Sequence, residues 1–97
     1  MQPVHLVLGA TGGIGSALCR RLAASGARLG LAARGEERLT TLANELGASA
    51  HVLDATSLED VARTASELVE RHGRLDGVVN CVGSIPTWRS LTGAASA

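Results

Sequence analysis

Four glycines stand close together near the start of the chain, in the stretch LGATGGIG that runs from Leu8 to Gly15. Glycine costs conformational entropy on folding, so such a cluster indicates a ligand that must come close to the backbone. Gly9 would allow a tight turn, Gly13 would leave room for a phosphate, and Gly15 would let a helix pack against a strand. Thr11 can donate its hydroxyl to a phosphate oxygen. The stretch therefore predicts a pyrophosphate site made of backbone N–H groups.

Such a loop needs a strand before it and a helix after it, and the sequence supplies both. Apolar runs predict buried strands, and apolar residues at helical spacing predict helices. The predicted strands are Val4–Leu8, Leu29–Ala33, Ser49–Leu53 and Gly77–Cys81, and the predicted helices are Ile14–Ser25, residues 35–47 and Leu58–Arg71. The order β-α-β-α-β-α-β predicts an α/β fold of the Rossmann type, a doubly wound parallel sheet with strand order 3-2-1-4. Residues 84–97 lack periodicity and are predicted to form a loop or tail.

Composition limits the class of protein and its partners. The chain has 97 residues, 45% of them hydrophobic, and a formal net charge of zero, which fits one small domain with a core. It has no basic or acidic block, so neither nucleic acid nor a membrane surface is an expected partner. The apolar run near the N-terminus is too short for a signal peptide or a membrane span, so we expect a cytoplasmic location. Cys19 and Cys81 are predicted to be buried, reduced thiols, and no metal-ligand spacing is present.

The end of the second predicted strand bears on the choice of cofactor. In a βαβ unit the glycine stretch predicts dinucleotide binding, and an acidic residue about 20 positions further on would bind the ribose of NAD. The chain has Ala33 and Arg34 at that place and no acid. A guanidinium binds a 2′-phosphate through paired, charge-assisted hydrogen bonds, so Arg34 favours NADP over NAD. In the alternative interpretation, Arg34 is a surface charge that pairs with Glu36 or Glu37.

These motifs resemble the short-chain dehydrogenase/reductase family, whose phosphate loop is Thr-Gly-x-x-x-Gly-x-Gly. Gly9, Gly13 and Gly15 match its three glycines, and Leu8 stands where the family usually has threonine. Gly9, Gly12 and Gly15 equally fit the Gly-x-x-Gly-x-x-Gly pattern of the extended and atypical branches. The loop alone therefore does not indicate to which branch of the family the chain is similar.

The resemblance also implies further cofactor-binding residues. Asp54, in LDAT, matches the family's aspartate that contacts the adenine ring, with Ala55 beside it; the alternative is that Asp54 caps the following helix. The stretch NCVG resembles the family's Asn-Asn-Ala-Gly motif after the fourth strand. Asn80 and Gly83 match this motif, and the two residues between them depart from it. Ile14, in the first turn of the first predicted helix, completes the predicted site.

The family's chemistry requires a Tyr-x-x-x-Lys pair and a serine beyond the fourth strand. This sequence contains no tyrosine and no lysine, so we predict no catalytic residue in it. We expect the cofactor-binding half of an NADP(H)-linked oxidoreductase that acts on an unidentified carbonyl or alcohol substrate, with a homo-oligomer as a further expectation. Two alternatives stay open: a non-catalytic NAD(P)-binding module, and an epimerase-like or reductase-like enzyme of the extended or atypical branch.

Overall fold

The computed structural model describes residues 2–82 and 87–90. Its elements are β1 (Val4–Leu8), α1 (Gly13–Ala24), β2 (Arg28–Ala33), α2 (Glu36–Leu46), β3 (Ser49–Val52), α3 (Leu58–His72), β4 (Gly77–Asn80) and β5 (Thr87–Ser90). The predicted order of the first seven elements is confirmed, with ends that differ by at most one residue. The ends of two helices have local causes: the Ser57 hydroxyl accepts a hydrogen bond from the Asp60 backbone N–H (3.3 Å) at the start of α3, and Gly47 and Gly73 end α2 and α3 in the left-handed region.

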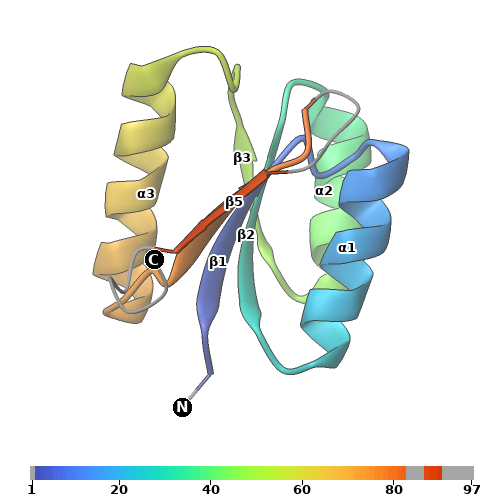
Figure 1. Ribbon diagram of the computed structural model, residues 1–97. Helices are drawn as coiled ribbons and strands as arrows, with labels where there is room; N and C mark the ends of the chain where they lie inside the picture. Colours follow the sequence, from blue (N-terminus) through green and yellow to red (C-terminus); the bar gives the residue numbers. More distant parts are fainter. Residues whose placement is uncertain (1, 83–86, 91–97) are drawn as a thin grey trace.

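The strands form one sheet in the order β3-β2-β1-β4-β5. The first four strands are parallel, and β1 lies in the middle, paired with both β2 and β4. Helices α1 and α2 cover one face of the sheet and α3 covers the other (Figure 1). The predicted doubly wound Rossmann fold and its strand order 3-2-1-4 are confirmed.

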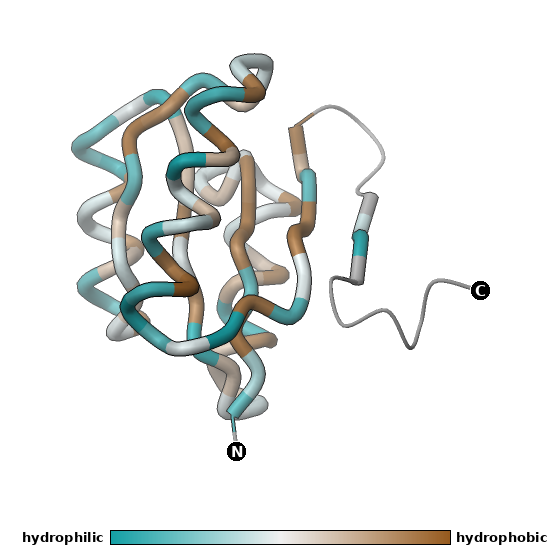
Figure 2. The backbone as a smooth tube through the Cα atoms, turned by 90° about the vertical axis from the view of Figure 1, so that its left-hand side faces the viewer, coloured by the Kyte–Doolittle hydropathy of each residue, from teal (hydrophilic) through white to brown (hydrophobic). Residues whose placement is uncertain are grey.

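The core has one part on each face of the sheet, because successive strand residues point to opposite faces. Val7 and Leu31 are buried in the part that includes side chains of α1 and α2. Leu6 and Ala32 are buried in the other part, together with Leu68 of α3. Along the tube in Figure 2, hydrophobic residues follow the central strands, while hydrophilic and hydrophobic residues alternate along the helices. The two parts of the core hold the strands in place, and the candidate site lies at the ends of these strands.

The prediction of a loop or tail over residues 84–97 is wrong for Thr87–Ser90, which form β5. This strand pairs antiparallel with β4, with Asn80 opposite Thr87 and Val78 opposite Arg89, so the sheet is mixed rather than wholly parallel. The cause is tertiary: the free edge of β4 offers unpaired N–H and C=O groups that a short neighbouring segment can satisfy. The remaining residues of the predicted tail lie outside the described residues.

Helix α3 leaves part of its apolar surface uncovered. Its side chains Leu58 and Val69 are 84% and 45% exposed, although Leu68 is fully buried. Within residues 2–82 and 87–90, no helix is long and apolar enough to cross a membrane.

Candidate cofactor-binding site

The glycine loop joins β1 to α1, and two of its glycines are required by the backbone. Gly9 has a φ of 74°, and a Cβ there would lie 2.9 Å from Cγ2 of Val82. A Cβ on Gly15 would overlap the carbonyl oxygen of Gly9. The roles predicted for these two glycines, a tight turn and close helix packing, are confirmed. They bring the start of α1 and the chain after β4 together at the carboxyl end of the sheet.

Gly13, the middle glycine of the pattern, has a different environment. A Cβ on Gly13 would meet no atom within 4 Å, so the fold itself does not require glycine there. Gly13 is the first residue of α1, which has Gly12 at its N-cap, no capping hydrogen bond from a described side chain, and no acidic residue in its first turn. The positive end of this helix and open space thus coincide, and a pyrophosphate fits both. Ile14 follows, 48% exposed.

A cavity of about 200 Å³ lies beside the loop, at the carboxyl ends of β1, β2 and β3. Five of the predicted cofactor-binding residues line it: Gly9, Thr11, Arg34, Asp54 and Ala55. These residues come from three separate motifs of the sequence, and the adjacency of the strands brings them to one place. Apolar side chains, among them Ala33 and Leu53, form its wall, as expected of a pocket for a flat ring with polar groups at its rim.

Asp54 is the polar group with the most contacts in this cavity. Its Oδ1 accepts hydrogen bonds from the backbone N–H of Thr56 (2.9 Å) and from the Thr56 hydroxyl (2.7 Å). Its Oδ2 lies 3.5 Å from Nη2 of Arg34. The two hydrogen bonds from Thr56, and then the charge of Arg34, lower the pKa of the Asp54 carboxyl below its ordinary value. Asp54 is therefore ionised at neutral pH and faces a cation across the mouth of the cavity.

Five residues that line the cavity were not predicted to bind the cofactor: Ala32, Ala33, Leu53, Thr56 and Val82. Thr56 orients the Asp54 carboxylate, and the sequence carries a usable signal for this in Asp-x-Thr, because an Asp side chain often accepts from the backbone two residues on. Val82 lines the cavity because Gly9 allows the chain after β4 to pass over it. Val82 belongs to the stretch NCVG, but no local pattern in the sequence indicates its contact with Gly9.

The predicted Asn-Asn-Ala-Gly-like motif is only partly described. Asn80 ends β4 beside Leu8 of β1, and its Oδ1 accepts a hydrogen bond from the backbone N–H of Val82 (2.9 Å). Asn80 is not among the residues that line the cavity, and it shapes the chain that passes over the glycine loop. Gly83 lies outside the described residues. Contact of either residue with a cofactor stays a prediction.

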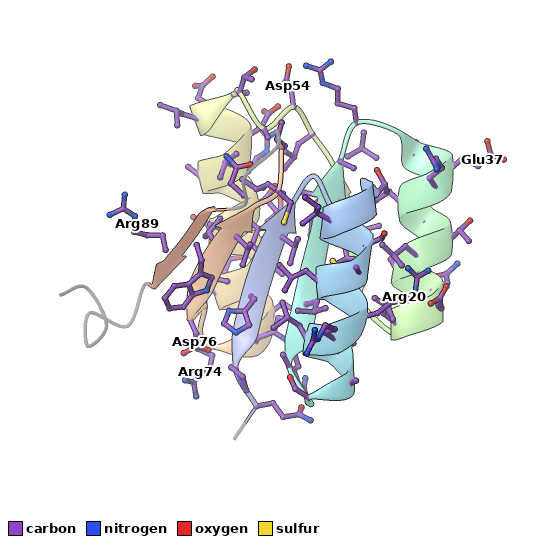
Figure 3. The ribbon with its side chains drawn as sticks, turned by 45° about the vertical axis from the view of Figure 1, so that its right-hand side comes forward. Arg20, Glu37, Asp54, Arg74, Asp76 and Arg89 are labelled. Atoms are coloured by element: carbon purple, nitrogen blue, oxygen red, sulfur yellow. The ribbon has the colours of Figure 1, made fainter. Side chains whose placement is uncertain are left out.

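A second, larger hollow of about 380 Å³ lies between α1 and α2 and shares Thr11 with the cavity. Its lining is charged: Arg20 donates two hydrogen bonds to Glu45 (2.9 and 3.3 Å), and Glu37 and Arg38 stand nearby (Figure 3 labels Arg20 and Glu37). Despite its size, this hollow lacks the apolar wall that the adenine ring of a cofactor requires. The two hollows meet at the glycine loop, with Arg34 in one and Arg38 in the other.

The two cysteines are free and buried, as predicted. Burial, and then the neighbouring Cys81, raise the pKa of the Cys19 thiol to about 12, and burial raises the pKa of Cys81 as well. Both side chains are therefore protonated at neutral pH and serve as small core residues.

The family model described as "short chain dehydrogenase" matches residues 3–95. The chain belongs to this family. A protein of Streptomyces violaceoruber assigned as ketoacyl reductase 1 of the granaticin polyketide synthase is 47% identical over 88 residues, which cover 84% of this chain and 32% of that protein. The A-factor type gamma-butyrolactone 1′-reductase of Streptomyces virginiae is 43% identical, over 79% of this chain and 32% of that protein. The chain thus spans about a third of the length of these short-chain dehydrogenase relatives.

Solved structures of the family carry the same fold. A variant of actinorhodin polyketide ketoreductase, solved with NADPH, has a TM-score of 0.78 and 39% identity over 86% of this chain and 34% of that one. A metagenomic short-chain oxidoreductase in complex with NADP has a TM-score of 0.71 and 34% identity over 78% of this chain and 37% of that one. The resemblance of the glycine loop and NCVG to this family is therefore confirmed.

Proposed function

We propose that this chain is the NADP-binding part of a short-chain reductase or dehydrogenase that transfers hydride between the nicotinamide and a carbonyl or alcohol. The pyrophosphate would lie at the N-terminus of α1, over Gly13, and the adenosine in the cavity between Arg34 and Asp54. NADP supplies the hydride chemistry when bound, and the residues of this chain bind and orient it.

One observation carries the choice of NADP. At the carboxyl end of β2, where an NAD-binding member would present a carboxylate to the ribose, the chain has the small apolar Ala33 followed by the guanidinium of Arg34. Both residues line the cavity, and the Arg34 side chain is 77% exposed and so within reach of a ligand. The NADP and NADPH complexes of the two similar structures support the same choice.

Titration of the folded chain with NADP and NAD by calorimetry tests this proposal. Wild type should bind NADP more tightly. Ala33→Asp should reverse the preference, because the new carboxylate offers hydrogen bonds to the ribose hydroxyls of NAD and repels a 2′-phosphate. Ala50→Asp is the matched control, since Ala50 is an exposed residue of β3 outside the cavity. Circular dichroism of each variant verifies that it is folded.

A folded wild type that binds NAD as tightly as NADP would refute the proposed cofactor. Binding of neither cofactor by a folded chain would refute the site. An unchanged preference in Ala33→Asp would show that the end of β2 does not face the ribose.

A non-catalytic NAD(P)-binding module is a second candidate, because the chain contains no tyrosine and no lysine to supply a proton in the way that the family does. Under both proposals this chain should bind the cofactor. It should not oxidise NADPH when carbonyl compounds are present. Turnover by the purified chain would contradict both proposals, provided that a variant unable to bind the cofactor, purified in the same way, shows no turnover. A Tyr-x-x-x-Lys pair encoded downstream in the same gene would favour the reductase.

A further inference from the structure

The Asp54 carboxylate is held in one orientation by its own loop. Both hydrogen bonds from Thr56 go to Oδ1, at 2.9 and 2.7 Å. Oδ2 is left for Arg34, whose Nη2 lies 3.5 Å away. The pair thus joins a fixed anion to a long and exposed cation, which can move away without disturbing the turn at Thr56.

The sheet makes this pair and places it over the cavity. Arg34 follows β2 and Asp54 follows β3, and these strands are neighbours, with Ala33 opposite Val52 in the register. Both side chains line the same cavity of about 200 Å³. Within the part of the chain that the structure describes, Glu36 and Glu37 make no ion pair with Arg34, although both are closer in sequence.

From this geometry we propose that Asp54 weakens the preference of the site for NADP, by competing with the 2′-phosphate of NADP for the guanidinium of Arg34. The inference rests on the proposed binding of NADP. NAD has no group that needs Arg34, so it can bind with the ion pair intact. NADP brings a second anion, which must draw the same guanidinium away from Oδ2 of Asp54. The carboxylate therefore lowers the affinity for NADP and leaves the affinity for NAD unaffected through this route.

The expected size of the effect follows from the exposure of the pair. Its side chains are 77% and 46% exposed, so solvent screens their attraction. Measured exposed pairs imply that Asp54 reduces the preference for NADP by about two- to fivefold. The site should still prefer NADP. The 2′-phosphate can accept paired hydrogen bonds from Arg34, which are stronger than the single 3.5 Å contact between Arg34 and Asp54.

A double-mutant cycle tests the competition. Calorimetric titrations of NADP and NAD are made on wild type, Asp54→Asn, Arg34→Ala and the double variant. The quantity compared is the ratio of the Kd for NAD to the Kd for NADP. Any contact of Asp54 with the adenine ring affects both cofactors and cancels in this ratio. Asparagine keeps an oxygen that can accept from Thr56, so the turn is retained, and circular dichroism verifies the fold.

In the presence of Arg34, Asp54→Asn should raise the ratio by about two- to fivefold. In the Arg34→Ala background the same substitution should leave the ratio nearly unchanged. Asp60→Asn is the matched control, because Asp60 is also paired with an arginine (Arg63, 2.8 Å) but lies in α3 outside the cavity. Its ratio should equal that of wild type.

Two results would overturn the inference while leaving the proposed function in place. A ratio that is unchanged or lower in Asp54→Asn would show that the carboxylate does not compete for Arg34. An equal rise with and without Arg34 would show simple repulsion between Asp54 and the phosphate. By contrast, a folded wild type without preference for NADP would refute the proposed function itself, and the inference with it.

Discussion

Two arginine–aspartate pairs lie at opposite ends of the sheet, and they are built differently. At the amino end, before β4, Arg74 donates hydrogen bonds to both carboxylate oxygens of Asp76, which also accepts one from the backbone N–H of Val4 (2.8 Å). At the carboxyl end, Arg34 makes one contact of 3.5 Å with Asp54. Figure 3 shows Asp54 at one end of the molecule and Arg74 with Asp76 at the other.

Burial follows the same division. The side chain of Asp76 is 10% exposed, so the three hydrogen bonds that it accepts from Val4 and Arg74 replace the water that it has lost. The side chain of Asp54 is 46% exposed and that of its arginine 77%. A buried and fully paired carboxylate stabilises the fold, here by joining the starts of β1 and β4. An exposed and loosely paired one leaves its arginine available to a ligand. We therefore expect substitutions in the Arg74–Asp76 pair to change stability and those in the Arg34–Asp54 pair to change binding.

The largest effect on binding is expected at the glycine loop. Gly13→Val should weaken NADP binding by about a hundredfold or more, because its side chain would occupy the place of the pyrophosphate and remove several charge-assisted hydrogen bonds. The melting temperature should change little, since a Cβ there meets no atom within 4 Å. Calorimetric titration and thermal unfolding by circular dichroism measure the two quantities.

Gly15→Ala provides the contrast within the same loop. Its Cβ would overlap the carbonyl oxygen of Gly9, so this variant should lose stability as well as binding. If Gly13→Val binds NADP as wild type does, the loop is not the phosphate site.

A smaller effect is expected from the loose pair. Arg34→Ala should reduce the preference for NADP over NAD by about ten- to a hundredfold, the value of one charge-assisted contact of about 1.5–3 kcal/mol. The loss should fall on NADP alone, and high salt should shrink the wild-type preference, because the guanidinium is exposed. Arg63→Ala, which removes an exposed arginine of α3, serves as the control. Equal weakening of NAD and NADP by Arg34→Ala would mean that Arg34 acts on the shared part of the cofactor.

The glycine loop and the loose pair also differ in how far the sequence reveals them. The buried strands are short apolar runs such as Val4–Leu8, and the constraints on Gly9 and Gly15 follow from a strand–turn–helix junction, so both were predictable. The partner of Arg34 was not, because it comes from the next strand of the sheet, whereas Glu36 and Glu37 are nearer along the chain. Contacts set by strand adjacency leave no local pattern.

The strand β5 was missed for a related reason. Thr87–Ser90 pairs with β4 through backbone groups, and backbone pairing needs no alternation of apolar side chains. The periodicity that predicts a half-buried strand is therefore absent from the segment. What the sequence lacks here is information about a free edge, which exists only once the other four strands have assembled.

The tight pair should affect stability and leave binding unchanged. Asp76→Asn should lower the melting temperature by about 5–10 °C, because a neutral amide cannot accept from Val4 and from both donors of Arg74. Its ratio of Kd values for NAD and NADP should equal that of wild type. Asp54→Asn is the matched comparison and should lower the melting temperature by no more than about 2 °C. A larger loss in Asp54→Asn than in Asp76→Asn would refute the division between the two ends.

The smallest effect, and the sharpest comparison of the two pairs, is their dependence on pH. Hydrogen bonds from Arg74, and then from the backbone of Val4, lower the pKa of Asp76 below its ordinary value of 3.8, and His5 acts in the same direction when charged. A carboxylate whose pKa is lowered by folding contributes stability above the unfolded value and loses it as the pH falls through the folded one. The melting temperature of wild type should therefore exceed that of Asp76→Asn between pH 5 and 7, and the difference should shrink below about pH 4.

The pKa of Asp54 is lowered as well, so its contribution has the same sign. Because that pair is exposed, the difference between wild type and Asp54→Asn should be smaller at every pH, and 0.5 M NaCl should reduce it further while sparing the contribution of Asp76. Equal pH and salt profiles for the two variants would show that the pairs do not differ in kind.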